Sequence, residues 1–294
     1  MTPIIPRGKG VLLWQLDSCK PQPMSSLVGA LDLNGFDWAG PKIADGILRY
    51  NQSTIQAFAL SCEQAHIACV PWVYSYGPVQ GSMEGIRQEA RLHAQIMHEL
   101  GLHTMMIDVE KEYKRVGAPT FAREYLKTLR SAGPDLTIGL CSYRFPHAQP
   151  EVPWDVLLPG VDFYAPQVYW VEAHNSAEQL RLSHMEYTTG LHKPYLPIGA
   201  SYFEAGWGPD PAEIAAFQAE AHRLSLQGLG WWAWDDHGLQ EHPAWLGVIT
   251  KDEWPITHPE PPTPPTPAEL LEARVDRLER FNDQEHTAKW RAFE

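Results

Sequence analysis

Two carboxylates with one residue between them, Asp108 and Glu110, follow the apolar run at residues 105–107. Side chains two residues apart on a β-strand point to the same face, with Cα atoms about 6.5 to 7 Å apart. Both carboxyl groups would then enter one cavity, where repulsion and partial burial raise the pKa of one of them. A protonated acid beside an ionised carboxylate suits cleavage of a glycosidic bond. We predict Glu110 as the general acid and Asp108 as the group that orients or polarises the substrate.

The position of this pair, rather than its spacing, makes it specific. A chain with 36 acidic residues will contain some Asp-x-Glu tripeptides by chance. This one ends a predicted inner strand, where an unpaired carboxylate is costly unless it has a function. The alternative is an ion pair or a helix cap that involves Lys111 or Lys114.

Polar and aromatic residues at the other predicted strand ends are candidates for substrate binding. Gln167 and Tyr169 share a face by the same period, and an amide with a phenol can hydrogen-bond an N-acetyl group; a purely structural pair is the alternative. Arg144 can clamp a carboxylate such as a lactyl or uronate group, unless it pairs internally with Glu110 or Glu112. The predicted substrate-binding residues are Asp45, Tyr74, Tyr143, Arg144, Gln167, Tyr169, Trp232, Trp234 and Asp236.

Aromatic residues are abundant and clustered. The chain has 12 Trp and 11 Tyr, several of them in the strings YSY, VYW and WWAW. The C–H faces of sugar rings stack on such π surfaces. Large aromatic side chains also fill large cores, which is the alternative for any single tryptophan.

Metal and cofactor motifs are absent from the sequence. The 13 histidines form no HxH or HExxH pattern, so we predict neither a metal site nor a cofactor. No G-x-S-x-G elbow or P-loop occurs, which argues against a serine hydrolase and against nucleotide chemistry.

The net charge and the N-terminal residues limit the classes of partner that we expect. The net charge is −13 and no run of Lys or Arg occurs, so nucleic acid is not an expected partner. The first apolar run, at residues 11–16, is too short for a signal peptide or a membrane span. We expect cytoplasmic synthesis without a signal peptide and no membrane partner. The four cysteines lack CxxC spacing, which favours free thiols.

Eight short apolar runs alternate with amphipathic stretches, a pattern typical of strand–helix units around a parallel sheet. The predicted strands cover residues 11–17, 38–45, 67–76, 103–110, 136–143, 161–169, 195–202 and 229–235, and the clearest predicted helices cover 83–100 and 211–226. The pattern predicts an α/β fold, a (β/α)₈ barrel over residues 1–254. A doubly wound open sheet is the rival, and no GxGxxG follows the first strand to support it.

The composition changes after Trp254. Residues 255–267 are Pro-rich and predict an extended linker. Residues 268–294 carry Leu271, Val275 and Leu278 at helical spacing. Two heptads are marginal for a coiled coil, so this segment is either a docking or oligomerisation helix, for a protein partner or a homo-oligomer, or a frayed tail.

Several strings resemble a known group of proteins. KIADG, IDVEKEYK, CSYRFPH, YAPQVYW and GLGWWAWDD resemble glycoside-hydrolase-like TIM barrels of bacteria and phages, distantly similar to glycoside hydrolase families eighteen and twenty-five, the chitinase and lysozyme-type muramidase barrels. The resemblance implies that Glu110 is the acid, Asp108 its partner and Tyr169 the strand-six tyrosine of the chitinase type. The chain departs from the longer D-x-x-D-x-D-x-E motif, and Tyr169-Trp170 stands where chitinases have Tyr-Asp.

These observations predict a glycosidase that acts on an N-acetylated polysaccharide. Peptidoglycan is the first expectation, and a phage or virion-associated lysin, released on lysis or carried on the virion, is the expected setting. The alternative is a non-catalytic carbohydrate-binding or structural decoration barrel on a particle. A metal-dependent deacetylase is a third, weaker possibility.

Overall fold

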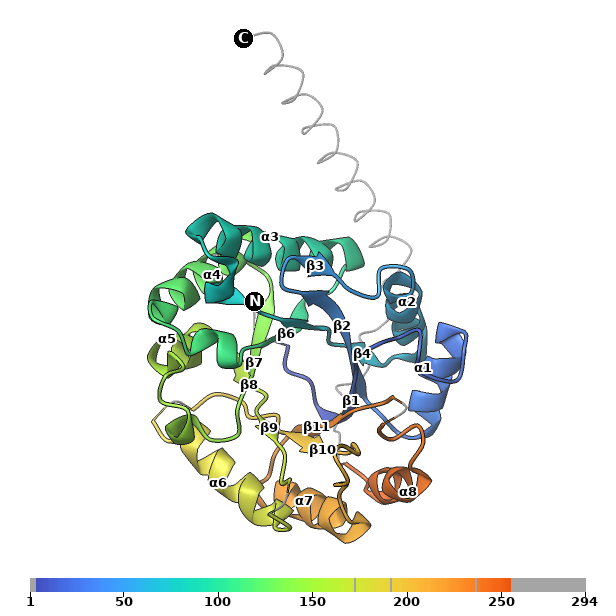
Figure 1. Ribbon diagram of the computed structural model, residues 1–294. Helices are drawn as coiled ribbons and strands as arrows, with labels where there is room; N and C mark the ends of the chain where they lie inside the picture. Colours follow the sequence, from blue (N-terminus) through green and yellow to red (C-terminus); the bar gives the residue numbers. More distant parts are fainter. Residues whose placement is uncertain (1–3, 172, 191, 236, 255–294) are drawn as a thin grey trace, which may run out of the picture. The chain divides into compact units, whose positions relative to one another are not determined.

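The computed structural model describes residues 4–171, 173–190, 192–235 and 237–254, which form a ring of helices around a parallel sheet (Figure 1). The predicted linker at 255–267, the predicted helix at 268–294 and Asp236 lie outside the described residues. The predicted (β/α)₈ fold is confirmed.

The sheet closes on itself. Its strands follow the order β8-β7-β6-β5-β2-β1-β11-β10-β9. Strands β8 and β9 are successive segments of one strand position, and parallel bridges Tyr143 to Gln167 and Tyr164 to Tyr195 join this position to both of its neighbours. The described strands are β1 (Gly8–Leu13), β2 (Trp38–Asp45), β3 (Leu48–Arg49), β4 (Ala68–Cys69), β5 (Trp72–Tyr74), β6 (Thr104–Asp108), β7 (Thr137–Cys141), β8 (Phe163–Tyr164), β9 (Gln167–Val168), β10 (Ile198–Ala200) and β11 (Gly228–Trp232).

All eight predicted strand positions are occupied; β2 has the predicted bounds and the other strands are shorter than predicted. Pro71 lies between β4 and β5, and Pro166 between β8 and β9. A proline has no N–H to give to the ladder, so each of these strands is interrupted there. The first strand begins earlier than predicted, at Gly8, because residues 8–12 pair in register with residues 228–232 of β11.

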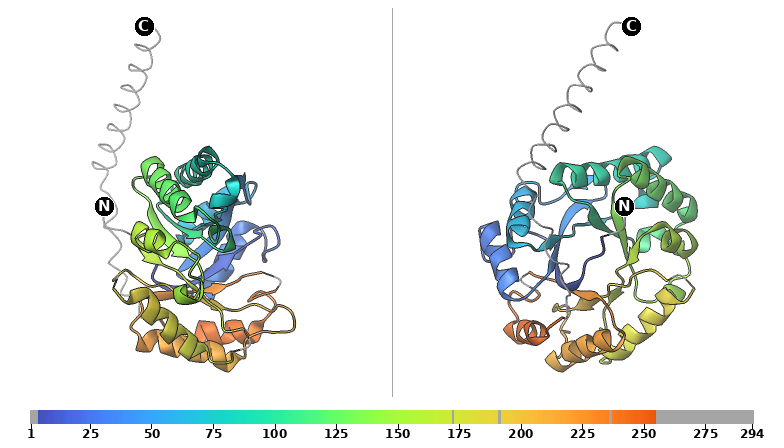
Figure 2. Two further views of the ribbon diagram at one scale, coloured as in Figure 1. Left: turned by 60° about the vertical axis from the view of Figure 1, so that its left-hand side comes forward. Right: turned by 180° about the vertical axis from the view of Figure 1, so that it is seen from behind.

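Helices α1 to α8 surround the sheet (Figure 2). They are α1 (Met24–Leu33), α2 (Ile55–Ala65), α3 (Met83–Leu100), α4 (Ala118–Ala132), α5 (Trp154–Gly160), α6 (Ser176–Thr188), α7 (Pro211–Arg223) and α8 (Pro243–Lys251), with short 3₁₀ turns at Gly77–Gln80, Lys111–Tyr113 and Pro146–Ala148. Helix α3 has the predicted bounds because the Ser82 hydroxyl accepts from Gly85 N–H at 3.0 Å at one end and Gly101 adopts a φ of 68° at the other. Helix α7 ends three residues earlier than predicted.

Two apolar layers hold the barrel. The larger lies between the strands and the helices, and a smaller cluster fills the barrel interior around Trp38, which is fully buried. Gly10 and Gly230 make room for that indole, because a Cβ at Gly10 would lie 1.8 Å from the ring and one at Gly230 would lie 2.7 Å from it. The interior is therefore packed solid below the mouth.

Lys9 closes the base of the barrel. It lies near the start of β1 with a relative exposure of 5%, and its Nζ donates to the backbone oxygens of Ile249 at 3.3 Å and Asp252 at 2.7 Å. This ammonium therefore ties the first strand to the end of the last described helix. In the described part of the chain, no helix is long and apolar enough to cross a membrane.

Candidate active site

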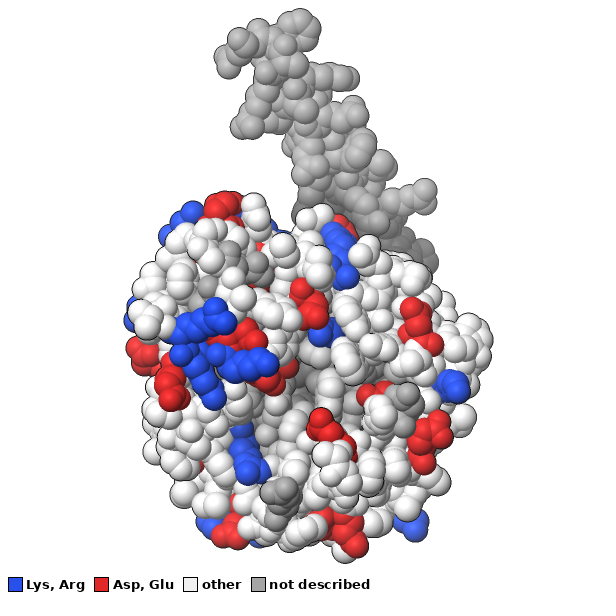
Figure 3. All heavy atoms as spheres, viewed as in Figure 1, with Lys and Arg blue, Asp and Glu red and all other residues white. Residues whose placement is uncertain are grey.

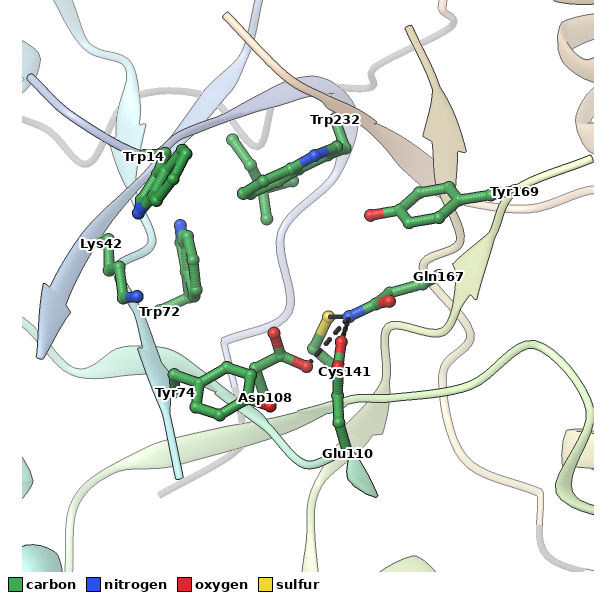
Figure 4. Close-up of a pocket in the computed structure, with 11 residues that line it drawn as sticks. Trp14, Lys42, Trp72, Tyr74, Asp108, Glu110, Cys141, Gln167, Tyr169 and Trp232 are labelled. Atoms are coloured by element: carbon green, nitrogen blue, oxygen red, sulfur yellow. Dashed lines mark hydrogen bonds between the residues drawn. The ribbon is translucent and has the colours of Figure 1, made fainter. Parts of the chain in front are cut away.

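A cavity of about 270 Å³ opens at the carboxyl ends of the strands (Figure 4). Asp108 ends β6 and Trp232 ends β11, so these residues mark the mouth of the barrel. This is the end at which (β/α)₈ enzymes carry their chemistry. The cavity is lined by Leu12, Trp14, Lys42, Trp72, Tyr74, Asp108, Glu110, Cys141, Gln167, Tyr169 and Trp232.

One amide nitrogen bridges the carboxyl pair. Gln167 Nε2 donates to Asp108 Oδ1 at 3.0 Å and to Glu110 Oε1 at 2.9 Å. The same nitrogen lies 3.7 Å from the Cys141 sulfur. The two carboxyl groups therefore enter the same cavity, and Gln167 fixes their separation.

Asp108 is the deeper member of the pair. It is buried, whereas Glu110 is only half-buried. Burial, followed by the nearby charge of Glu110, raises the pKa of Asp108 well above its usual range, although Lys42 and hydrogen bonds with Cys141 and Gln167 oppose the shift. Asp108 therefore keeps its proton to a higher pH than an ordinary aspartic acid, and Glu110 lies closer to bulk solvent.

A third carboxylate, which the sequence analysis did not single out as a site residue, supports the wall of the cavity. Glu112 is buried and its Oε2 accepts from the Tyr74 hydroxyl at 2.6 Å. Burial and this bond raise the pKa of Tyr74, so its phenol stays protonated. The signal was present in the sequence, because Glu112 continues the period of two that Asp108 and Glu110 begin.

Three indole rings lie across the cavity from the carboxyl pair (Figure 4). Trp72 and Trp232 meet edge to face with ring centroids 5.4 Å apart, and Trp72 Nε1 donates to the Leu13 backbone oxygen at 3.3 Å. Trp14 is 43% exposed at the rim. Only Trp232 was predicted here; Trp14 was missed because the first strand was predicted to continue through it, and in fact it ends at Leu13.

Lys42, also missed, is a buried cation in the cavity wall. It lies in β2 with a relative exposure of 6%, and its Nζ is 3.4 Å from Asp45 Oδ2 and 5.1 Å from the Trp72 ring centroid. Asp45, predicted to bind substrate, is not among the residues that line the cavity and instead pairs with Lys42. A lysine within an apolar strand was the available signal.

A second cavity, of about 350 Å³, adjoins the first. Both are lined by Gln167 and Tyr169. Two predicted residues, Tyr143 and Arg144, line the second cavity and not the first. Of the predicted binding residues, Tyr74 and Trp232 line the first cavity only, and Gln167 and Tyr169 line both. The full lining of the second is Tyr143, Arg144, Phe145, Ala148, Gln149, Gln167, Tyr169 and Val171.

The prediction for Trp234 is wrong. This residue is buried at 3% exposure in the larger apolar cluster, donates from Nε1 to the Lys20 backbone oxygen at 2.9 Å and meets Phe36 edge to face. Strand β11 ends at Trp232, so alternation no longer places Trp234 on the same face. Asp236 lies outside the described residues.

Trp170, where chitinases have an aspartate, faces outward. Its ring is fully buried, lies against Phe217 of α7 and donates from Nε1 to Glu213 at 3.3 Å. Its neighbour Tyr169 lines both cavities. Within the described residues, no group of three or more His, Cys, Asp or Glu side chains could hold a metal ion.

Comparisons with known proteins identify the fold. No protein-family model and no curated protein sequence matches the chain. Among solved structures, a chitinase from Bacteroides thetaiotaomicron superposes with a TM-score of 0.66 at 10% identity, over 83% of this chain and 96% of that one. An endo-β-1,4-mannanase from Thermotoga petrophila gives a TM-score of 0.65 at 11% identity, over 83% and 76%.

A spore cortex-lytic enzyme from Bacillus megaterium gives a TM-score of 0.58 at 10% identity, over 83% of this chain and 73% of that one. Identities this low carry information about the fold alone. The chain therefore has the barrel fold that these chitinases, mannanases and cortex-lytic enzymes share, and its candidate site lies at the mouth of that barrel.

Proposed function

We propose that this protein is a glycoside hydrolase that cleaves an N-acetylated polysaccharide, with peptidoglycan as the first candidate. One observation carries the proposal: a single amide, Gln167, bridges a buried carboxyl and a half-buried carboxyl on the floor of an aromatic cavity. The fold shared with polysaccharide-cleaving enzymes supports it. A spore cortex-lytic enzyme is among the proteins that share this fold, and a phage or virion-associated lysin is the setting we propose.

The two carboxyl groups take different roles in this proposal. Glu110, nearer to solvent, gives a proton to the oxygen of the scissile glycosidic bond as the bond from that oxygen to the anomeric carbon breaks. Asp108, beside Glu110, hydrogen-bonds the sugar's acetamido group and orients it. The acetamido oxygen bonds to the anomeric carbon as the leaving oxygen departs; water then displaces the acetamido oxygen from that carbon and returns a proton to Glu110.

The surrounding residues hold the sugar in place. The indoles of Trp14, Trp72 and Trp232 offer π faces for the C–H faces of the ring. Tyr74, fixed by Glu112 at 2.6 Å, presents a rigid wall beside the carboxyl pair. Positioning of this kind supplies much of the rate enhancement that a hydrolase needs.

The test compares the unaltered protein with Glu110→Gln in an assay of reducing ends released from peptidoglycan and from chitin. We expect Glu110→Gln to lower the rate about 10²-fold to 10⁴-fold, the usual contribution of a general acid, with an unchanged melting temperature. Glu63→Gln, on the exposed side of α2, is the matched control and should keep full activity.

A non-catalytic carbohydrate-binding barrel is the second candidate, favoured by the three indoles that could hold a glycan without cleaving it. Failure of the unaltered protein to release reducing ends, together with retained glycan binding, would establish this alternative and overturn the hydrolase.

A further inference from the structure

We infer that the second cavity binds the carboxylate of an acidic sugar through Arg144, so that the substrate carries a carboxyl-bearing sugar next to the sugar held over Asp108 and Glu110. The inference rests on the proposed function and narrows its substrate class. It assigns a role to a guanidinium that the proposed reaction does not use.

Arg144 is a half-buried cation without a carboxylate partner among the described residues. Its Nη1 donates to the Tyr169 backbone oxygen, and its Cζ lies 5.1 Å from the Phe145 ring centroid. No ion pair joins it to Glu110 or Glu112, the internal partners that the sequence had left open, or to another carboxylate of the described chain.

The guanidinium of Arg144 has hydrogen-bond donors that a ligand can use. A guanidinium has five N–H donors, and one hydrogen bond from Arg144 to a described residue accounts for one of them. Partial removal of a charge from water is costly without a charged or hydrogen-bonding partner. Burial lowers the pKa of Arg144 from its ordinary value and Tyr202 opposes this shift, although a guanidinium remains charged. The remaining donors suit an anion.

The position of the cavity indicates where that anion belongs on the substrate. The second cavity shares Gln167 and Tyr169 with the first, so a sugar in the second cavity would lie next to a sugar in the first. Figure 3 shows basic side chains gathered beside the central hollow, on the side of α4 and α5. Lys114 belongs to this side, since its Nζ lies 4.5 Å from the Tyr143 ring centroid.

The lining favours a carboxyl-bearing sugar over a free small anion. Phe145 and Val171 give apolar contact, whereas Tyr143 and Gln149 offer a hydroxyl and an amide. Arginine binds carboxylates in a bidentate geometry. A lactyl ether and a uronic acid both present this group, and the test distinguishes these two sources.

The experiment measures dissociation constants by calorimetry for the full chain. One probe is a peptide-free peptidoglycan tetrasaccharide with free lactyl carboxylates, and the other is a hyaluronan tetrasaccharide with uronates. Each is compared with its carboxyl-reduced form. We expect the unaltered protein to prefer at least one acidic probe over its reduced form, and the preferred probe identifies the source of the carboxylate.

In Arg144→Gln, the dissociation constant for the preferred acidic probe should rise about 10-fold to 100-fold, the range for a lost charged hydrogen bond. The dissociation constant for the carboxyl-reduced form of the same probe should change less than about 2-fold. Arg144→Lys should fall between, since it keeps the charge but loses the bidentate geometry. Arg123→Gln, an exposed cation of α4 that pairs with Asp155 at 3.8 Å, is the charge-matched control and should match the unaltered protein.

Equal affinity of the unaltered protein for the acidic and reduced probes, or no binding of either, overturns the inference. So does an equal loss for both probes in Arg144→Gln when its melting temperature is unchanged. If Arg144→Gln unfolds, the comparison between Arg144→Lys and the unaltered protein decides by the same criterion. Release of reducing ends from a neutral glycan in the same preparation reports separately on the proposed hydrolase.

Discussion

Two buried lysines on neighbouring strands, one at each end of the barrel, have different surroundings. Lys9 in β1 and Lys42 in β2 have almost the same relative exposure, 5% and 6%. Lys9, at the base, donates to two backbone oxygens of the segment that ends α8. Lys42, at the mouth, has a carboxylate partner at 3.4 Å and lies near the faces of aromatic rings.

The difference shows that burial alone does not indicate whether a charged side chain has a structural or a functional role. At the base, carbonyl oxygens at hydrogen-bond distance replace the water that Lys9 loses, so this cation holds two parts of the chain together. At the mouth, Lys42 borders a cavity and affects the pKa of Asp108. In barrels of this fold, the base serves stability and the mouth serves function.

The largest expected effect comes from changing the base. In Lys9→Met, the backbone oxygens of Ile249 and Asp252 lose a donor inside the protein, at a cost of about 1–3 kcal/mol for each unsatisfied group. We expect the free energy of unfolding to fall by about 3 kcal/mol. Urea unfolding, monitored by tryptophan fluorescence, measures this change in the free energy of unfolding. Activity at 25 °C should change less than about 2-fold; a large loss of activity with normal stability would contradict the contrast.

The matching change at the mouth should have the opposite signature. In Lys42→Met, activity should fall about tenfold, equivalent to about 1.4 kcal/mol in the barrier, and the free energy of unfolding should change by less than about 1 kcal/mol. Because the Lys42 charge lowers the pKa of Asp108, its removal should move the apparent pKa values of the carboxyl pair upward. The pH–rate profile measures this shift, and an unshifted profile would count against it.

A third prediction tests whether ionisation of Asp108 at the mouth lowers the free energy of unfolding. The pKa of Asp108 is raised in the folded protein, so its contribution to stability is fully present below the unfolded pKa and is lost as pH rises through the folded pKa. Asp108→Asn removes this loss. The variant should be more stable than the unaltered protein at alkaline pH, by about 1.4 kcal/mol for each pH unit by which the folded-state pKa of Asp108 exceeds its unfolded-state pKa, and should gain nothing near pH 3.

Unfolding in urea across this pH range measures the difference between the two proteins, and Asp17→Asn, an exposed aspartate outside the cavity, is the control. A constant difference at all pH values would show that Asp108 ionisation is not its source.

The alternation of apolar runs was enough to predict the barrel, because each strand must bury a short apolar segment and each helix must cover it. Helix α3 was predicted with its observed bounds because Gly101 follows its last turn, and the structure shows that Ser82 caps its first turn. Strand lengths were overestimated where prolines interrupt pairing, as at Pro166. The sequence shows a proline but does not show how far the ladder resumes beyond it.

The site was predicted in part for the same reason. Period two placed Asp108, Glu110 and Gln167 correctly beside one cavity, since all three lie at or near the ends of strands. The rule failed for Trp234, which follows the end of its strand. Lys42 and Trp72 were missed because a polar or aromatic residue inside an apolar run does not by itself show which face of the sheet it occupies.

The pairing of β1 with β11 has a consequence for how the protein is made. Residues 8–12 find their partners at residues 228–232, so the first strand of the ring leaves the ribosome long before its neighbour exists. Until then one edge of the growing sheet offers unpaired backbone groups to other chains, and contacts of this sequence separation form slowly. A synthesis product that stops before Gly228 would keep that edge open, which makes premature termination a route to aggregation rather than to a shorter barrel.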